Sequence, residues 1–162
     1  MDIPTTLKHK PVIVSRDYDK IDGRNEASDA KGLSVGLAQW NERGAVDASV
    51  KIWRHTGEKW SRQSEELPPH RVLDLAILLC RSLAHFREAY RYPKLYDEQN
   101  TVIDAVALQG GKLDVSVCTD NPMLDTDIKL LRDALERDGE ILGERLRRLT
   151  DALAELDYTA RG

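Results

Sequence analysis

Residues 33–79 decide the fold: LSVGLAQWNERGAVDASVKIWRHTGEKWSRQSEELPPHRVLDLAILL. Apolar and polar residues alternate over 33–40 and 46–54, which is the period of half-buried β-strands. Gly57 interrupts the chain after the second of these stretches, before a third strand expected over residues 58–63. This part of the sequence therefore predicts an antiparallel β-meander.

A helix is expected directly after the meander. Pro68 and Pro69 end the strand, and proline is tolerated in the first turn of a helix. Over residues 70–90 two neighbouring apolar stripes recur every three or four residues. A surface that wide needs cover on two sides. The meander can provide one side, and the other requires further layers or a second subunit.

The remainder of the chain predicts a hairpin and leucine-rich helices. Gly110 and Gly111 separate two alternating stretches, residues 101–108 and 112–118, as in a β-hairpin. After Pro122, aliphatic residues follow a three-four spacing. They are Ile128, Leu131, Leu135, Leu142, Leu146, Leu149, Leu153 and Leu156.

Two glycines interrupt this last pattern, Gly139 and Gly143. Each costs about 1 kcal/mol relative to alanine inside a helix. Residues 122–158 therefore form either one long helix or two helices joined near these glycines.

The N-terminal part carries weaker patterns. Residues 11–14 are β-branched after a proline and predict an edge strand. Residues 17–32 are polar without a period and predict a long loop. Its carboxylates do not match the ligand spacing of a calcium loop, so no metal site is expected there.

Taken together, the patterns predict a single α+β domain over residues 1–162. An antiparallel β-meander packed on a helix occupies residues 31–92, a second hairpin residues 101–118, and C-terminal leucine-rich helices residues 122–158. We expect the helices to support a homodimer.

Composition narrows the class of protein. With 162 residues and 41% hydrophobic content, the chain can bury one core. It has no apolar run near the roughly 20 residues of a membrane span, and the N-terminus lacks a signal sequence, so a soluble, cytoplasmic protein is expected. Cys80 and Cys118 have no partner at metal-ligand spacing and are interpreted as buried free thiols.

Charge is distributed unevenly along the chain. The net charge is -4, which argues against strong non-specific binding to duplex DNA. Residues 1–93 carry 15 Lys and Arg against 13 Asp and Glu, whereas residues 94–162 carry 9 against 15. An anionic ligand would therefore bind to the first half.

Aromatic and basic residues gather in that half. A sheet face with indole rings beside cations can hold single-stranded nucleic acid by stacking and phosphate contacts. The candidate nucleic-acid-binding residues are Lys51, Trp53, Arg54, Lys59, Trp60 and Arg62. No catalytic motif, cofactor site or metal site is predicted, so the chain is not expected to be an enzyme. A hydrolase using His70 would rest on residue availability alone.

A resemblance adds to this interpretation. Trp40-Asn41, a polar turn, Val46-Asp47 and the strand end at residues 51–54 resemble the single-stranded-DNA-binding fold of transcriptional positive cofactor four and its small bacterial relatives. The resemblance covers roughly residues 31–83. It implies a four-stranded curved sheet, a dimer formed through helices and a groove lined by basic and aromatic side chains. The whole chain also looks like a bacterial family of domains of unknown function.

One stretch departs from the pattern of those proteins. Where they carry a basic entry to the helix, residues 63–67 read QSEEL, and two carboxylates would repel phosphate. Two hypotheses follow. The first is a non-enzymatic single-stranded nucleic-acid-binding protein with a role in transcription or DNA maintenance. The alternative is a dimeric interaction or assembly module that keeps the fold without binding nucleic acid.

Overall fold

The computed structural model describes residues 1–20, 28–41, 48–61, 65–67, 69–109 and 111–158. It has the predicted α+β class, with a four-stranded antiparallel sheet, a second hairpin and helices that include two at the C-terminal end. The chain divides into two compact units, Met1–Ala76 and Ile77–Gly162.

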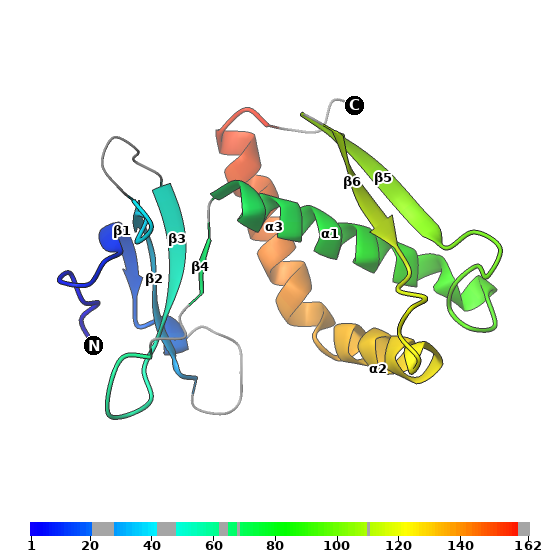
Figure 1. The fold of residues 1–162 in the computed structure, drawn as a ribbon, viewed down its shortest axis with the longest axis horizontal. Coiled ribbons are helices and arrows are strands. Elements are labelled where there is room, and N and C mark those ends of the chain that lie inside the picture. Colours follow the sequence, from blue (N-terminus) through cyan, green and yellow to red (C-terminus); the bar gives the residue numbers. More distant parts are fainter. Residues whose placement is uncertain (21–27, 42–47, 62–64, 68, 110, 159–162) are drawn as a thin grey trace. The chain divides into compact units, whose positions relative to one another are not determined.

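The first unit contains the four-stranded sheet. Its strands are β1 (Lys10–Arg16), β2 (Ala30–Leu37), β3 (Ala48–Arg54) and the short β4 (Glu66–Leu67). All neighbours are antiparallel, in the order β1-β2-β3-β4 (Figure 1). The edge strand expected at residues 11–14 and the two strands of the meander are therefore confirmed.

The register sorts side chains onto two faces of this sheet. Leu33 pairs with Ile52, and Val50 pairs with Leu67. Because side chains alternate along a strand, these aliphatic residues share one face, and Ser34 and Trp53 lie on the other. The first face is apolar, with Ile52 37% exposed.

The N-terminal segment, residues 1–9, lies over the second face. His9 is fully buried and bonded to Ser34 of β2. Ile3 is also buried, and a Cβ added at Gly32 would lie 2.7 Å from its Cδ1 atom. Glycine is required at position 32 because the N-terminal segment approaches the strand so closely.

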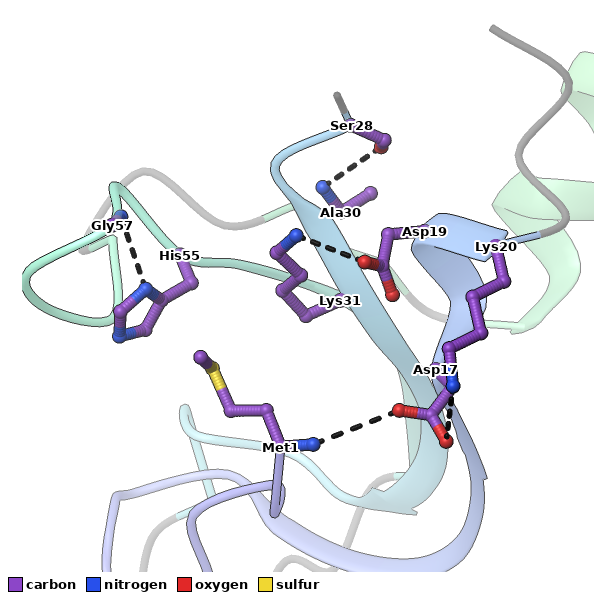
Figure 2. A network of polar contacts seen from close by, with 9 residues as sticks. All are labelled: Met1, Asp17, Asp19, Lys20, Ser28, Ala30, Lys31, His55 and Gly57. Atoms are coloured by element: carbon purple, nitrogen blue, oxygen red, sulfur yellow. Dashed lines mark hydrogen bonds and ion pairs between the residues drawn. The ribbon is translucent and has the colours of Figure 1, made fainter. Parts of the chain in front are cut away.

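A polar network fastens the turn after β1 (Figure 2). Asp17 has φ 56°, and a short 3-10 helix, η1 (Tyr18–Lys20), follows it. The Lys31 ammonium donates to Asp19 Oδ2 at 2.9 Å, which ties η1 to β2 and lowers the pKa of Asp19. The expected loop of residues 17–32 thus includes η1 and the start of β2, while residues 21–27 lie outside the described residues.

The prediction of a third strand at residues 58–63 is wrong for residues 58–61, which the structure describes. Residues 62 and 63 lie outside the described residues. Residues 58–61 form no strand, and only an isolated bridge joins Trp60 to His55. The pairing with β3 occurs later, at Glu66 and Leu67. The hydroxyl of Thr56 explains the difference, because it bonds both to the amide and to the carbonyl of Lys59 and closes a tight turn.

The helix expected at residues 70–90 is confirmed. It runs as α1 (Pro69–Glu88) and continues as a 3-10 turn, η2 (Ala89–Arg91). The predicted hairpin is present in the second unit as β5 (Val102–Leu108) and β6 (Gly111–Ser116).

The C-terminal region consists of two helices, which settles the alternative left open by the sequence. They are α2 (Leu124–Arg137) and α3 (Gly139–Glu155), with the break at Asp138 (Figure 1). Gly139 begins the second helix and therefore does not interrupt a continuous one.

The core of the second unit gathers around η2 and the loop after it. Ala89, Leu95 and Ile128 are buried together, with Phe86 and Tyr96 packed against them. Leu95 has φ 67°, which is unusual for a residue with a side chain, so its burial holds the loop in this conformation.

Two further expectations concern single features. Cys80 and Cys118 are free, as expected, but both are exposed, so the prediction that they are buried is wrong. Within the described part of the chain, no helix has the length and apolar character needed to cross a bilayer.

Candidate functional site

Trp53, at the centre of the predicted nucleic-acid surface, is enclosed. Its side chain is 1% exposed, and its Nε1–H donates to Ser34 Oγ at 2.8 Å. The rings of His9 and Trp60 contact it edge-on, at centroid distances of 5.8 and 5.9 Å. The Lys51 ammonium lies 4.3 Å from the ring centroid. No face of this indole is open for a base to stack on.

A directed chain of hydrogen bonds holds this indole. Tryptophan can only donate, so Ser34 Oγ accepts from Trp53 and its own proton is available to His9 Nε2, 2.9 Å away. With a neutral imidazole, His9 Nδ1–H then donates to Glu66 Oε1 at 2.7 Å. The same carboxylate oxygen accepts the backbone amide of Gln39. These hydrogen bonds link the N-terminal segment to β2, β3 and β4.

The order serine, histidine, carboxylate is also the order of a nucleophilic relay. Here Ser34 is 4% exposed and its oxygen already receives the indole N–H. A substrate carbonyl would have no approach to this oxygen. The group therefore acts structurally: it fixes the rotamers of His9 and Trp53 beneath the N-terminal segment.

The predicted cations fall into separate environments. Alternation along β3 places Lys51 on the face of Trp53 and Arg54 on the opposite face. Arg54 bonds Asp29 at 2.8 Å and Glu65 at 3.4 Å, and the hydrogen bond to Asp29 raises its pKa. Burial lowers the pKa of Lys51. Both cations are thus engaged with groups of the chain itself.

Lys59 and Trp60 lie in the turn after β3. Lys59 is exposed at the tip of the turn, and Trp60 is half-buried beside it, with its ring 5.1 Å from that of His55. The Gly57 amide donates to His55 Nδ1 at 3.0 Å, which stiffens the turn (Figure 2). Arg62 lies outside the described residues.

The second unit contains a polar groove that the sequence patterns did not predict. Its volume is about 310 Å3, and it lies between the last turns of α1, the loop of residues 92–100 and β5. Arg81, His85 and Glu88 contribute from one stripe of α1. The spacing of these residues by four and three was a usable signal, but the loop that closes the groove has no periodic pattern.

The loop is held firmly. His85 Nε2 donates to the Leu95 carbonyl at 2.9 Å, and Lys94 pairs with Glu98 at 2.6 Å. Lys94 also lies 3.8 Å from Asp125 of α2, and these carboxylates raise its pKa. Side chains of the loop are therefore presented in a fixed arrangement.

The comparison with protein families identifies the family of this chain. The model for a family of unknown function, DUF6530, matches residues 1–158. The chain belongs to the DUF6530 family. No curated protein matches the chain, and no solved structure does. The resemblance of the whole chain to a family of unknown function is confirmed, and the DUF6530 match carries no statement about activity.

Proposed function

We propose that this chain is a non-enzymatic assembly module in which helix α3 pairs with the same helix of a second copy. The observation that carries the proposal is a leucine seam along α3 and the residue after it, whose last three leucines are partly exposed. Its spacing is four, three, four and three residues. The seam consists of Leu142, Leu146, Leu149, Leu153 and Leu156.

The two halves of the seam have different surroundings. Leu142 and Leu146 line an apolar groove together with Leu83 and Phe86 of α1. Leu149, Leu153 and Leu156 are 40, 37 and 66% exposed. A helix surface with a regular three-four leucine spacing is stabilised when a second helix covers it, because the leucines of one helix fit between those of the other.

Charge favours a second copy as the occupant, in antiparallel orientation. Arg145, Arg147 and Arg148 precede the centre of the exposed seam, and Asp151 and Glu155 follow it. In an antiparallel pair centred on Leu149, the basic block of each helix lies at the same level along the helix axis as the acidic block of the other. Such a two-fold arrangement uses the same surface on both subunits.

Small residues permit close approach at this seam. Gly143 and Ala152 flank the leucines, and neither has a side chain that would separate two helices. Full burial of a leucine stabilises by about 1.5–3 kcal/mol. Because these leucines are already partly covered, each gains a fraction of that, and the six of a dimer together supply a moderate affinity.

Sedimentation equilibrium tests the proposal. We expect the full chain to have twice its monomer mass of 18.3 kDa, and Leu149→Gln with Leu153→Gln to shift it toward the monomer. Glu140→Gln with Glu144→Gln changes the opposite face of the same helix and serves as the matched control. A wild-type chain that stays monomeric at its highest soluble concentration would refute the proposal.

Single-strand binding is a second candidate, confined to the turn that carries Lys59 and Trp60. The specific observation is a stiffened turn that holds an exposed ammonium beside a partly exposed indole.

An oligonucleotide titration across a salt series tests it. We expect weak, salt-sensitive binding to a single strand that falls with Lys59→Ala and with Trp60→Ala, since phosphate contact and stacking are lost separately. Lys8→Ala, another exposed lysine of the first unit, is the control. No binding at low salt would remove this candidate and leave the assembly module untouched.

A further inference from the structure

The polar groove of the second unit has an uneven charge balance. Arg81 of α1 pairs with Asp104 of β5 at 3.0 Å, and Arg91 pairs with Glu88 at 3.1 Å. Both arginines of the groove therefore have a carboxylate partner. Asp97 contributes a further negative charge to the lining.

Asp97 differs from the other carboxylates of the groove. Its Oδ1 accepts the backbone amide of Gln99 at 2.9 Å, and among the described residues no cation forms an ion pair with it. A carboxylate in a half-enclosed groove favours a positively charged partner, because the surrounding protein screens the charge less than bulk water does. Asn100, on the same loop, adds an amide to the lining.

The remaining walls are aliphatic. Ala84 from α1, Val102 and Ile103 from β5 and Val117 after β6 contribute to the lining. A volume of about 310 Å3 is at the lower end of the roughly 300–1,000 Å3 found for small-molecule pockets. At about 30 Å3 for a water-sized group, it holds about ten non-hydrogen atoms.

We propose that this groove binds a small ligand with a primary ammonium group and a short aliphatic chain. The ammonium donates to Asp97 and Asn100, and the chain packs on Val102 and its aliphatic neighbours. Because the loop of residues 92–100 is already fixed by Leu95 and His85, the ligand meets a formed site and orders little backbone on binding.

Titration with n-butylammonium chloride, followed by amide NMR of the full chain, tests this site. We expect saturable shifts at Gln99, Asn100 and Val102. Sodium butyrate has a chain of similar length and the opposite charge, and should produce no saturable shift there. Shifts of equal size with both probes, or none with either, would overturn the proposal.

Two variants test whether binding of n-butylammonium depends on the negative charge of Asp97. Asp97→Asn keeps an oxygen for the Gln99 amide, so the turn is retained, while the charge is lost. We expect at least about fivefold weaker binding, since a charge-assisted hydrogen bond is replaced by a neutral one. Asp120→Asn removes an exposed charge outside the groove and should leave binding unchanged. Unchanged affinity in Asp97→Asn, with its amide spectrum otherwise native, would refute the role of Asp97.

Discussion

Replacing Ser34 by alanine tests the structural role of the buried hydrogen-bond chain. The hydroxyl is shared, because it accepts from Trp53 Nε1 at 2.8 Å and lies 2.9 Å from His9 Nε2. Its removal leaves two buried polar groups without this partner, and each such group costs about 1–3 kcal/mol. We therefore expect Ser34→Ala to lower the free energy of unfolding of the first unit by about 2–6 kcal/mol.

Tryptophan fluorescence in urea measures this effect selectively. Trp40, Trp53 and Trp60 are the three tryptophans of the chain, and all lie in the first unit. Ser15→Ala, an exposed serine of β1, is the matched control and should change stability by less than about 0.5 kcal/mol. A Ser34→Ala midpoint equal to that of Ser15→Ala would refute the reasoning.

A double-mutant cycle separates the hydrogen bond from packing. Trp53→Phe keeps an aromatic ring and removes the indole donor. In the Ser34→Ala background, Trp53→Phe should lower the free energy of unfolding by about 1 kcal/mol less than in the wild type. The hydrogen bond between Trp53 Nε1 and Ser34 Oγ is already absent there. Strict additivity of the two changes would show that the bond contributes nothing measurable.

Three further outcomes are expected. Burial lowers the pKa of Lys51 below 10.5, so the folded chain releases this proton at lower pH than the unfolded chain. Wild-type stability should therefore rise relative to Lys51→Met as the pH increases toward 10.5, and urea midpoints at several pH values would show parallel curves if this were wrong. Gly32→Ala should destabilise by about 1–3 kcal/mol through its clash with Ile3, and Ile3→Ala should relieve part of that cost; lack of any relief in the double variant would contradict the contact. Cys80 and Cys118 should both react with a thiol reagent in the native chain, whereas labelling only after unfolding would mean that they are covered.

Strand positions were predictable from the sequence because their signal is local. The alternation at residues 33–40 and 46–54 locates β2 and β3, whose register then pairs Leu33 with Ile52. The fourth strand was not predictable in the same way. Side chains of a turn, above all Thr56, decide where the chain returns to β3, and strand periodicity carries no information about that.

The environment of the candidate site depended on contacts that are distant in sequence. Alternation correctly assigns Lys51 and Trp53 to one face, but it cannot say whether that face is covered. The cover comes from residues 1–9, a stretch of mixed polarity without periodicity, through His9 and Ile3. Likewise, the ion pairs of Arg54 involve Asp29 and Glu65, which are separated from it by loops.

The magnitudes also indicate which residues a nucleic acid could use. Access to the face of Trp53 requires displacement of the N-terminal segment. That exposes Ile3, at about 1.5–3 kcal/mol, and breaks the hydrogen bonds of His9, at about 1 kcal/mol each. Stacking of one base returns about 1–3 kcal/mol. The exchange is unfavourable for a single base on Trp53. The exposed Lys59 and the partly exposed Trp60 are therefore the residues at which we would look for strand binding.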